Sequence, residues 1–436
     1  MDELRAVVMR YPWRPVLLAT LGVVLMLILG TTLIDLSFRW QLDQEYDDDR
    51  YHALKGTCYW AGDARNYMYI ALDGYTSYDR ALLTPHLTQL DERSWWPLFP
   101  VLAGQVISWG GGSCSSRTVN GVAYVLLVPI FQALTKERRW WRLLLLGMLP
   151  FGAWMYVGEA DTFFLALSGL LVLAVRGAPD APRRAGVLSF VAGVVLGLAK
   201  PNALALIPAL GIWGLTWIAA HLRAMPPPEK RRAWIGRILS DANPGWAPLL
   251  AALGIVLSTM WWIYQTSGYY PYYVLMVQRS LWWHEFKAWD PVSFSQNFHL
   301  AIEYARTGRI NMSELQRLVE LSAVLFGLAL CVSCLPPCWP GGERSLIPLH
   351  WRVGVLSIFV LMFASGQSHA FERYTVSNVF VMLAYYRRVF GTPEHPPDWR
   401  IWTLPGLLRW LWLLCAPVMW VLTYLLLGWN PLNYWL

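Results

Sequence analysis

Charged residues are scarce in this sequence. Asp, Glu, Lys and Arg together make up 14% of the 436 residues, whereas hydrophobic residues make up 56%. A soluble globular domain contains about 25% charged residues. The shortage therefore excludes a soluble globule, and it indicates an integral membrane protein that crosses the membrane several times.

Patterns that would indicate other classes of protein are also missing. The six cysteines form no disulfide framework, and no second pair follows Cys331, Cys334 and Cys338 to complete a metal site. The 35 basic residues exceed the 28 acidic ones, but no nucleic-acid motif accompanies them. We expect neither a nucleic-acid partner nor a metal cofactor, although the run Asp47 to Asp49 leaves a divalent cation as an alternative.

Eleven apolar windows dominate the sequence. With their flanks they reach ~17 to 25 residues, the length that crosses a bilayer as a helix. They lie near residues 16–36, 119–134, 140–157, 160–175, 185–199, 201–220, 246–266, 318–335, 351–365, 372–390 and 407–428. The sequence therefore predicts an all-α polytopic membrane protein, in which residues 1–436 form a single integral membrane domain of about eleven transmembrane helices.

The basic residues indicate the orientation of these helices. They cluster in short loops at residues 136–142, 176–184 and 221–237, and such loops lie on the cytoplasmic side. All three loops fall on that side only if residues 96–109, a short segment with two prolines, do not cross the membrane. We expect this segment to lie at the interface or to re-enter from outside.

Two long loops then lie outside the cytoplasm: residues 37–118, with interfacial helices, and residues 267–317. The turn around Glu159 and Asp161 and the break at Lys200 fall on the same side. We find no internal repeat, and the polar residues stand at the ends of the spans. Both observations argue against a transporter built from repeated halves, which places polar residues near the middle of the membrane.

The first long loop contains the most informative motif. At ~100° per residue, Asp63, Tyr67 and Ile70 share one face of a helix, and Asn66 lies beside them. An acid presented just outside the membrane surface is a candidate general base for a lipid-linked substrate. The alternative for Asp63 is a helix N-cap, since it follows Gly62 at the start of a helical run.

Residues 63–75 read Asp-Ala-x-x-Tyr-x-x-Ile-Ala-x-x-Gly-Tyr, and residues 95–100 read Trp-Trp-Pro-Leu-Phe-Pro. This pattern resembles the PIG-V-type (GPI mannosyltransferase II-type) integral membrane mannosyltransferases of the GT-C superfamily. Weaker resemblance to the same family lies in residues 158–168, in the helix 192–206 with a break before its proline, and in residues 372–374.

The resemblance covers roughly residues 16–210 well and the remainder loosely, and it includes two departures. The acid of the family's Tyr-Thr-Glu-Ser maps to Asp161, which leaves Glu159 as an extra candidate. Where the family has Thr-Arg-Pro, this chain has Lys200 in place of the arginine. The positive charge remains, but the bidentate fork of arginine is lost.

The resemblance implies a GT-C-like fold and transfer of a sugar, mannose first of all, from a polyprenyl (dolichyl-type) phosphate donor to a lipid, glycan or protein acceptor. It implies transfer with inversion on the extracytoplasmic face. Asp63 would act as the base, and Asp161 or Glu159 would orient the acceptor or share that role. Lys200 and Arg373 would hold the departing phosphate. Alternatively, Glu159 and Asp161 only stabilise the start of a helix, where the helix dipole is positive. Arg373 would then be a charge that sets the membrane topology or supports the structure.

The remaining substrate-binding candidates are Tyr67, Asn66, Trp95 and Trp96. The two tryptophans could instead be interfacial anchors, because indole rings favour the surface of a membrane. Lys200 could instead extend its ammonium to water from an apolar helix.

Two other functions are compatible with the sequence. A GT-C transferase could use another polyprenyl-phosphate sugar such as arabinose, and a non-enzymatic flippase or transporter could move a lipid-linked sugar. No retrieval signal is visible, so we favour a bacterial plasma membrane, with the endoplasmic reticulum membrane as the alternative. The acceptor and the oligomeric state are left open.

Overall fold

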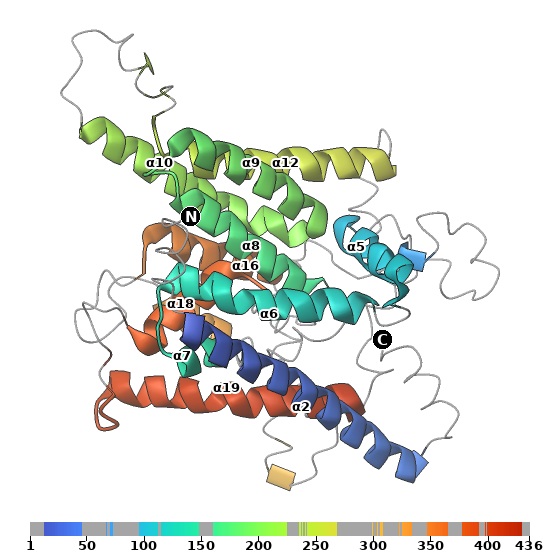
Figure 1. Cartoon of the computed structure of the whole chain (residues 1–436). Coiled ribbons are helices and arrows are strands. Elements are labelled where there is room, and N and C mark those ends of the chain that lie inside the picture. Colours follow the sequence, from blue (N-terminus) through green and yellow to red (C-terminus); the bar gives the residue numbers. More distant parts are fainter. Residues whose placement is uncertain are drawn as a thin grey trace.

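The computed structural model of the chain is a bundle of helices (Figure 1). It describes residues 13–45, 67, 70–72, 96–111, 115–147, 160–224, 235, 236, 238, 240, 242–267, 299, 303, 306, 307, 322, 325–333, 347–364, 377–391, 397 and 399–429. Every regular element in these residues is a helix, as the sequence predicts. The elements are α2 (Trp13–Glu45), α5 (Leu98–Val106), the π-helix η3 (Ile107–Gly111), α6 (Ser115–Thr135), α7 (Trp140–Gly147), α8 (Asp161–Arg176), α9 (Pro182–Ala199), the 3-10 helix η6 (Pro201–Leu206), α10 (Ile207–Arg223), α12 (Trp246–Ser267), α16 (Leu349–Ala364), α18 (Val379–Phe390) and α19 (Leu404–Trp429).

Several of these helices are long and apolar enough to cross a membrane. Among the described residues there are five: Trp13–Leu33, Ser115–Thr135, Pro182–Ala199, Pro201–Arg223 and Trp246–Gln265. Large side chains such as Leu25 and Val187 lie on the outer surface, 66% and 65% exposed, and exposed apolar surface of this kind marks contact with a membrane. The protein is therefore an α-helical integral membrane protein. Each of the other predicted windows overlaps a described helix.

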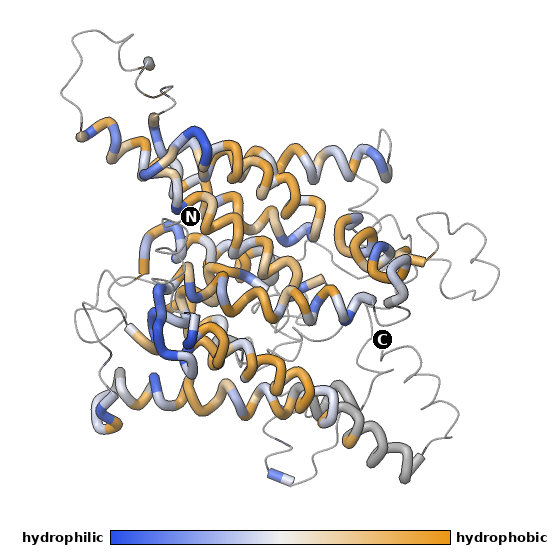
Figure 2. Tube along the Cα trace, in the orientation of Figure 1, coloured by the Kyte–Doolittle hydropathy of each residue, from blue (hydrophilic) through white to orange (hydrophobic). Residues whose placement is uncertain are grey.

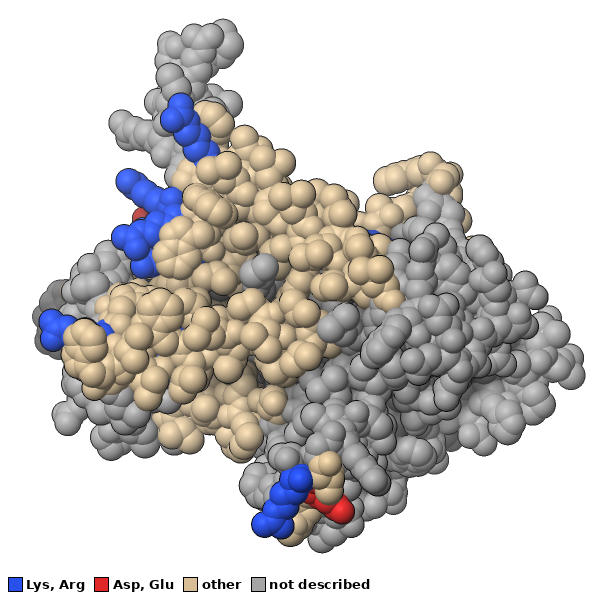
Figure 3. All heavy atoms as spheres, turned by 90° about the horizontal axis from the view of Figure 1, so that it is seen from below, with Lys and Arg blue, Asp and Glu red and all other residues tan. Residues whose placement is uncertain are grey.

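The bundle has two chemically different ends. At the basic end, α6, α8, α10 and α18 finish and α9 and α12 begin. At the other end, which we call the Asp161 end, α6, α8 and η6 begin and α9 and α12 finish. Hydrophilic segments gather at the basic end in Figure 2, on the left. Most of the Lys and Arg side chains visible in Figure 3 lie along the same edge.

Arginine side chains at the basic end bind the ends of helices. The last carbonyls of a helix have no partner within it and carry the negative end of its dipole. Arg176 donates to the carbonyl of Leu134 near the end of α6, and Arg388 donates to the carbonyl of Ser333. The Nε of Arg409 donates to the carbonyl of Arg388 in the last turn of α18, at 3.1 Å. These contacts place positive charge where the helix ends are negative.

Glycines allow α9 and α12 to lie very close together. A Cβ at Gly193 would meet the carbonyl oxygen of Ala251 at 2.2 Å, and one at Gly254 would meet that of Phe190 at 2.5 Å. Both distances are shorter than a Cβ contact in a protein, so larger residues would push the helices apart. This packing holds the end of α9 against α12, and it thereby positions Lys200, which follows α9.

The predicted extracytoplasmic loop, residues 37–118, includes helical residues at both of its ends. The helix α2 continues to Glu45, since no Gly or Pro interrupts the residues after 36, and α6 already begins at Ser115. Within the loop, the apolar helix Leu98–Gly110 is ~20 Å long at ~1.5 Å per residue. It is shorter than the ~30 Å hydrocarbon core of a bilayer, but so are α7 and α18, so the prediction that this segment does not cross rests on the basic loops and not on its length.

Candidate functional site

Asp161 is buried at the start of α8. It is the first residue of this helix, and the residue before it, Ala160, offers no side-chain cap. Its exposed fraction is 1%. An acid in the first turn interacts favourably with the positive end of the helix dipole, as the helix-start alternative expects. A buried carboxylate also needs a charged or hydrogen-bonding partner, because burying an unpaired charge is very unfavourable.

Lys200 is that partner. Its backbone is extended (φ −163°, ψ 146°) between α9 and η6, and Pro201 favours this conformation because the residue before a proline is pushed out of the α region. Its Nζ donates a hydrogen bond to Oδ1 of Asp161. The predicted break in the helix 192–206 is confirmed. Lys200 is only 5% exposed, so its ammonium does not extend to water.

The charges of this pair are expensive to bury. Taking an ion out of water costs several kcal/mol, and the attraction between partners offsets this cost only when their geometry is good. An apolar pair of similar volume is often as stabilising as a buried ion pair, or more so. Stability alone therefore does not explain why Asp161 and Lys200 are both charged residues, and the pair is a candidate for a functional role.

Tyr67 lies beside the start of α8, where Asp161 is the first residue. Its ring packs edge-on against Phe99 of α5, with ring centroids 5.0 Å apart. Both side chains belong to a buried cluster with Ala160, against which Phe163 also packs. Because Ala160 immediately precedes Asp161, the structure brings the predicted substrate-binding residue Tyr67 to the same place as the predicted acid.

Trp96 also lies at the Asp161 end. It is 3% exposed and packs against Trp262 near the end of α12, with Leu198 and Ile263 beside the two rings. Leu198 precedes Lys200 by two residues, so Trp96 lies close to the break that follows α9. A ring buried against protein in this way has little surface left for lipid headgroups, which favours the substrate-binding prediction for Trp96 over the interfacial anchor.

The other predicted site residues lie outside the described residues. These are Asp63, Asn66, Trp95, Glu159 and Arg373. The acidic run 47–49 and nearly all of the loop 267–317 also lie outside them. In the part of the chain that the structure describes, no group of three or more His, Cys, Asp or Glu side chains is placed to hold a metal ion.

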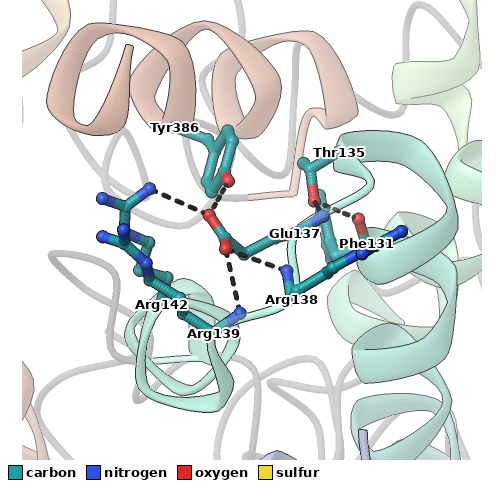
Figure 4. A network of polar contacts seen from close by, with 7 residues as sticks. All are labelled: Phe131, Thr135, Glu137, Arg138, Arg139, Arg142 and Tyr386. Atoms are coloured by element: carbon teal, nitrogen blue, oxygen red, sulfur yellow. Dashed lines mark hydrogen bonds and ion pairs between the residues drawn. The ribbon is translucent and has the colours of Figure 1, made fainter. Parts of the chain in front are cut away.

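Sequence reasoning missed a polar network at the basic end, which Figure 4 shows. Oε1 of Glu137 accepts hydrogen bonds from the backbone N–H groups of Arg138 and Arg139, both at 2.9 Å. Its Oε2 accepts from the guanidinium of Arg142 at 3.0 Å and from the hydroxyl of Tyr386. The carboxylate thus joins the start of α7 to the last turns of α18.

The environment of Glu137 favours its charged form. Burial raises the pKa of this carboxyl, but the hydrogen bonds from Tyr386, the Arg139 backbone and Arg142 outweigh that effect and hold the pKa below its usual value. The signal in the sequence is a single acid within a basic loop, directly after Lys136 and before two arginines. Lys136 has a left-handed backbone (φ 56°), so the chain turns sharply just before Glu137.

The Asp161 end combines groups that suit a phosphorylated ligand. It holds a buried ammonium, a carboxylate and aromatic rings, and α6 and α8 begin there, so their positive dipole ends lie at the same end. Positive helix ends together with a cation favour anions such as phosphate. No family model, curated protein or solved structure matches the chain, so the functional conclusion rests on these groups and on the motif resemblance.

Proposed function

We propose that the protein is an integral membrane glycosyltransferase, which moves a sugar, mannose first of all, from a polyprenyl-phosphate donor to a lipid, glycan or protein acceptor. The observation that carries this proposal is the buried pair of Asp161 and Lys200 beside Tyr67. These residues come from three segments that are far apart in the sequence and that each resemble PIG-V-type enzymes. Residues that form one active site must lie close together in the fold, and these three lie at the same end of the apolar bundle.

The transfer is a direct displacement. The acceptor oxygen attacks the anomeric carbon while a base takes the acceptor proton, and the bond from that carbon to the phosphate oxygen breaks. Attack opposite the leaving group inverts the anomeric configuration. The polyprenyl phosphate departs with increased negative charge, which Lys200 and Arg373 stabilise. Asp161 contacts Lys200, so its role here is to hold the ammonium in place rather than to orient the acceptor directly.

Asp63 is the base in this proposal. It precedes Tyr67 by four positions, so a continuous helix would bring Asp63 to the same face. Tyr67 and Ile70 pack with Ala160, the residue before Asp161. We propose Glu159, two positions before Asp161 in the sequence, as the second acid, and Asn66 and Trp95, which belong to the same two motifs as Tyr67 and Trp96, as further substrate contacts.

We further propose a GT-C-like arrangement with eleven crossings and an active site on the extracytoplasmic face of a bacterial plasma membrane. The alternating direction of consecutive helices from α8 to α12 and the basic residues at the opposite end support this topology. Nucleotide sugars are absent outside the cytoplasm, so a donor used there must arrive linked to a lipid. The apolar outer surface of the bundle suits an isoprenoid tail.

Purified protein in liposomes, supplied with polyprenyl-phosphate mannose and a mixture of glycolipid acceptors, tests this function. We expect polyprenyl phosphate to be released in step with the loss of donor. Movement of intact donor between leaflets without release of polyprenyl phosphate would instead identify a carrier. If polyprenyl phosphate were released from the arabinose-bearing donor in preference to the mannose-bearing one, the protein would still be a glycosyltransferase, but its sugar would be arabinose.

A further inference from the structure

Three buried polar atoms at the Asp161 end of the bundle have no hydrogen-bond partner within the described part of the chain. They are Nε1 of Trp96, Nδ2 of Asn202 and Oγ1 of Thr259. Most buried polar groups in proteins are paired, and leaving one unpaired costs about 1 to 3 kcal/mol. A group of such atoms in one region therefore indicates that a ligand binds there and forms hydrogen bonds with them.

The three residues lie on segments that meet near the break that contains Lys200. Asn202 follows Lys200 by two residues and lies on η6. Thr259 lies on α12, fully buried, and α12 meets the end of α9 at this level: a Cβ at Gly197 would lie 2.2 Å from Oγ of the adjacent Ser258. Trp96 packs against Trp262, one helical turn beyond Thr259.

These three groups differ chemically from the ion pair. The indole N–H is a donor only, the Asn amide nitrogen is a donor, and the Thr hydroxyl both donates and accepts. All three are neutral, so they do not supply charge to a phosphate. They match the hydroxyl groups of a sugar, which also donate and accept hydrogen bonds without charge.

We propose that Trp96, Asn202 and Thr259 form the subsite for the sugar of the donor, beside the charged subsite that Lys200 provides for its phosphate. This inference rests on the proposed function and assigns part of the same site. It makes these residues specificity determinants, since a site built to hydrogen-bond a hydroxyl discriminates strongly against a ligand that lacks it.

Ser189 supplies a matched control. Its hydroxyl is also fully buried and without a partner among the described residues, but it lies eleven residues before Lys200 on α9. That separation is about 16 Å along a helix, too far for the same sugar ring. Removing this hydroxyl tests the effect of losing a buried polar atom as such.

The experiment compares the binding of two lipids to the full-length protein in detergent: polyprenyl phosphate and polyprenyl-phosphate mannose. The variants are Thr259→Val, which removes the hydroxyl with little change of shape, Trp96→Phe, which removes the N–H together with part of the indole ring, and Ser189→Ala. Thr259→Val and Trp96→Phe should each bind the mannose-bearing lipid about 3- to 10-fold more weakly, the range for one neutral hydrogen bond. Both should bind polyprenyl phosphate as the wild type does, and Ser189→Ala should bind both lipids normally.

The possible outcomes separate this inference from the function on which it rests. Unchanged binding of the mannose-bearing lipid in Thr259→Val and Trp96→Phe, or equal weakening of both lipids, overturns the sugar subsite and leaves the transferase proposal in place. Failure of the wild-type protein to bind either lipid overturns the proposed function, and the subsite with it. An equal loss in Ser189→Ala also overturns the subsite, because the effect would then not depend on position.

Discussion

The ammonium of Lys200 donates to the carboxylate of Asp161 inside the bundle, although the two residues are 39 positions apart in the sequence. The contact connects the start of α8 to the residue that follows α9. It therefore depends on the antiparallel packing of these two consecutive helices, and it fixes a cation and an acid at the same end of the protein.

Removing either partner of this pair leaves the other as an uncompensated buried charge. Asp161→Asn and Lys200→Met should each lower the free energy of unfolding by ~3 to 5 kcal/mol, whereas the double variant should lose much less than the sum. Unfolding by SDS in mixed micelles measures all four proteins. Strictly additive losses would show that the two side chains do not interact.

The Glu137 network should make stability depend on acid pH. The pKa of this carboxyl is lowered in the folded protein, so its contribution is complete above the unfolded-state pKa, about 4.5, and is lost as the pH falls through the folded-state pKa. Glu137→Gln should lower stability at pH 7 by ~1 to 3 kcal/mol. It should also flatten the loss of stability between pH 5 and 3, relative to the wild type, in thermal unfolding scans. If Glu137→Gln lost stability between pH 5 and 3 as steeply as the wild type, Glu137 would not be the group responsible for this pH dependence.

Cysteine labelling tests the proposed orientation. In a cysteine-free background, Trp109→Cys and Asp180→Cys place single thiols on exposed positions at opposite ends of the bundle. A membrane-impermeant maleimide should label the first in intact cells and the second only after permeabilisation, because the basic loops lie inside. The reverse pattern would put the Asp161 end in the cytoplasm and remove the argument for a lipid-linked donor.

Asp63→Asn separates a base from a helix cap. Asparagine retains much of the capping ability of aspartate but cannot accept the proton, so turnover should fall by ~10² to 10⁴ while the melting temperature stays near that of the wild type. A cap predicts the opposite, with lower stability and preserved turnover per folded molecule. If the variant keeps more than about a third of wild-type turnover, the base must be sought among the acids around Asp161.

Much of the fold follows from local sequence. The apolar windows predict the helices, and the break at Lys200 follows from Pro201, which acts on its immediate neighbour. Each of these features depends on residues close together in the chain, where length, hydropathy and backbone sterics decide the outcome.

The contacts within the site could not be predicted in the same way. The pairing of Asp161 with Lys200 and the burial of Trp96 against Trp262 both depend on how helices pack. The link from Glu137 to Tyr386 spans 249 residues, and no pattern in a single sequence pairs residues so far apart. The motif resemblance nevertheless selected Tyr67, Asp161 and Lys200 as one site, and the structure brings these three to the same end of the bundle.

The most direct measurement of the central claim follows labelled sugar and polyprenyl phosphate together in liposomes that contain wild-type protein, Lys200→Met or Lys200→Arg. We predict that the wild type releases one polyprenyl phosphate for each sugar transferred. Lys200→Met should weaken donor use by ~1 to 3 kcal/mol per folded molecule, roughly 5- to 150-fold, whereas Lys200→Arg keeps the charge and much of the activity. A wild-type protein that moves the donor without releasing polyprenyl phosphate, or a Lys200→Met variant with wild-type donor use, would contradict the account.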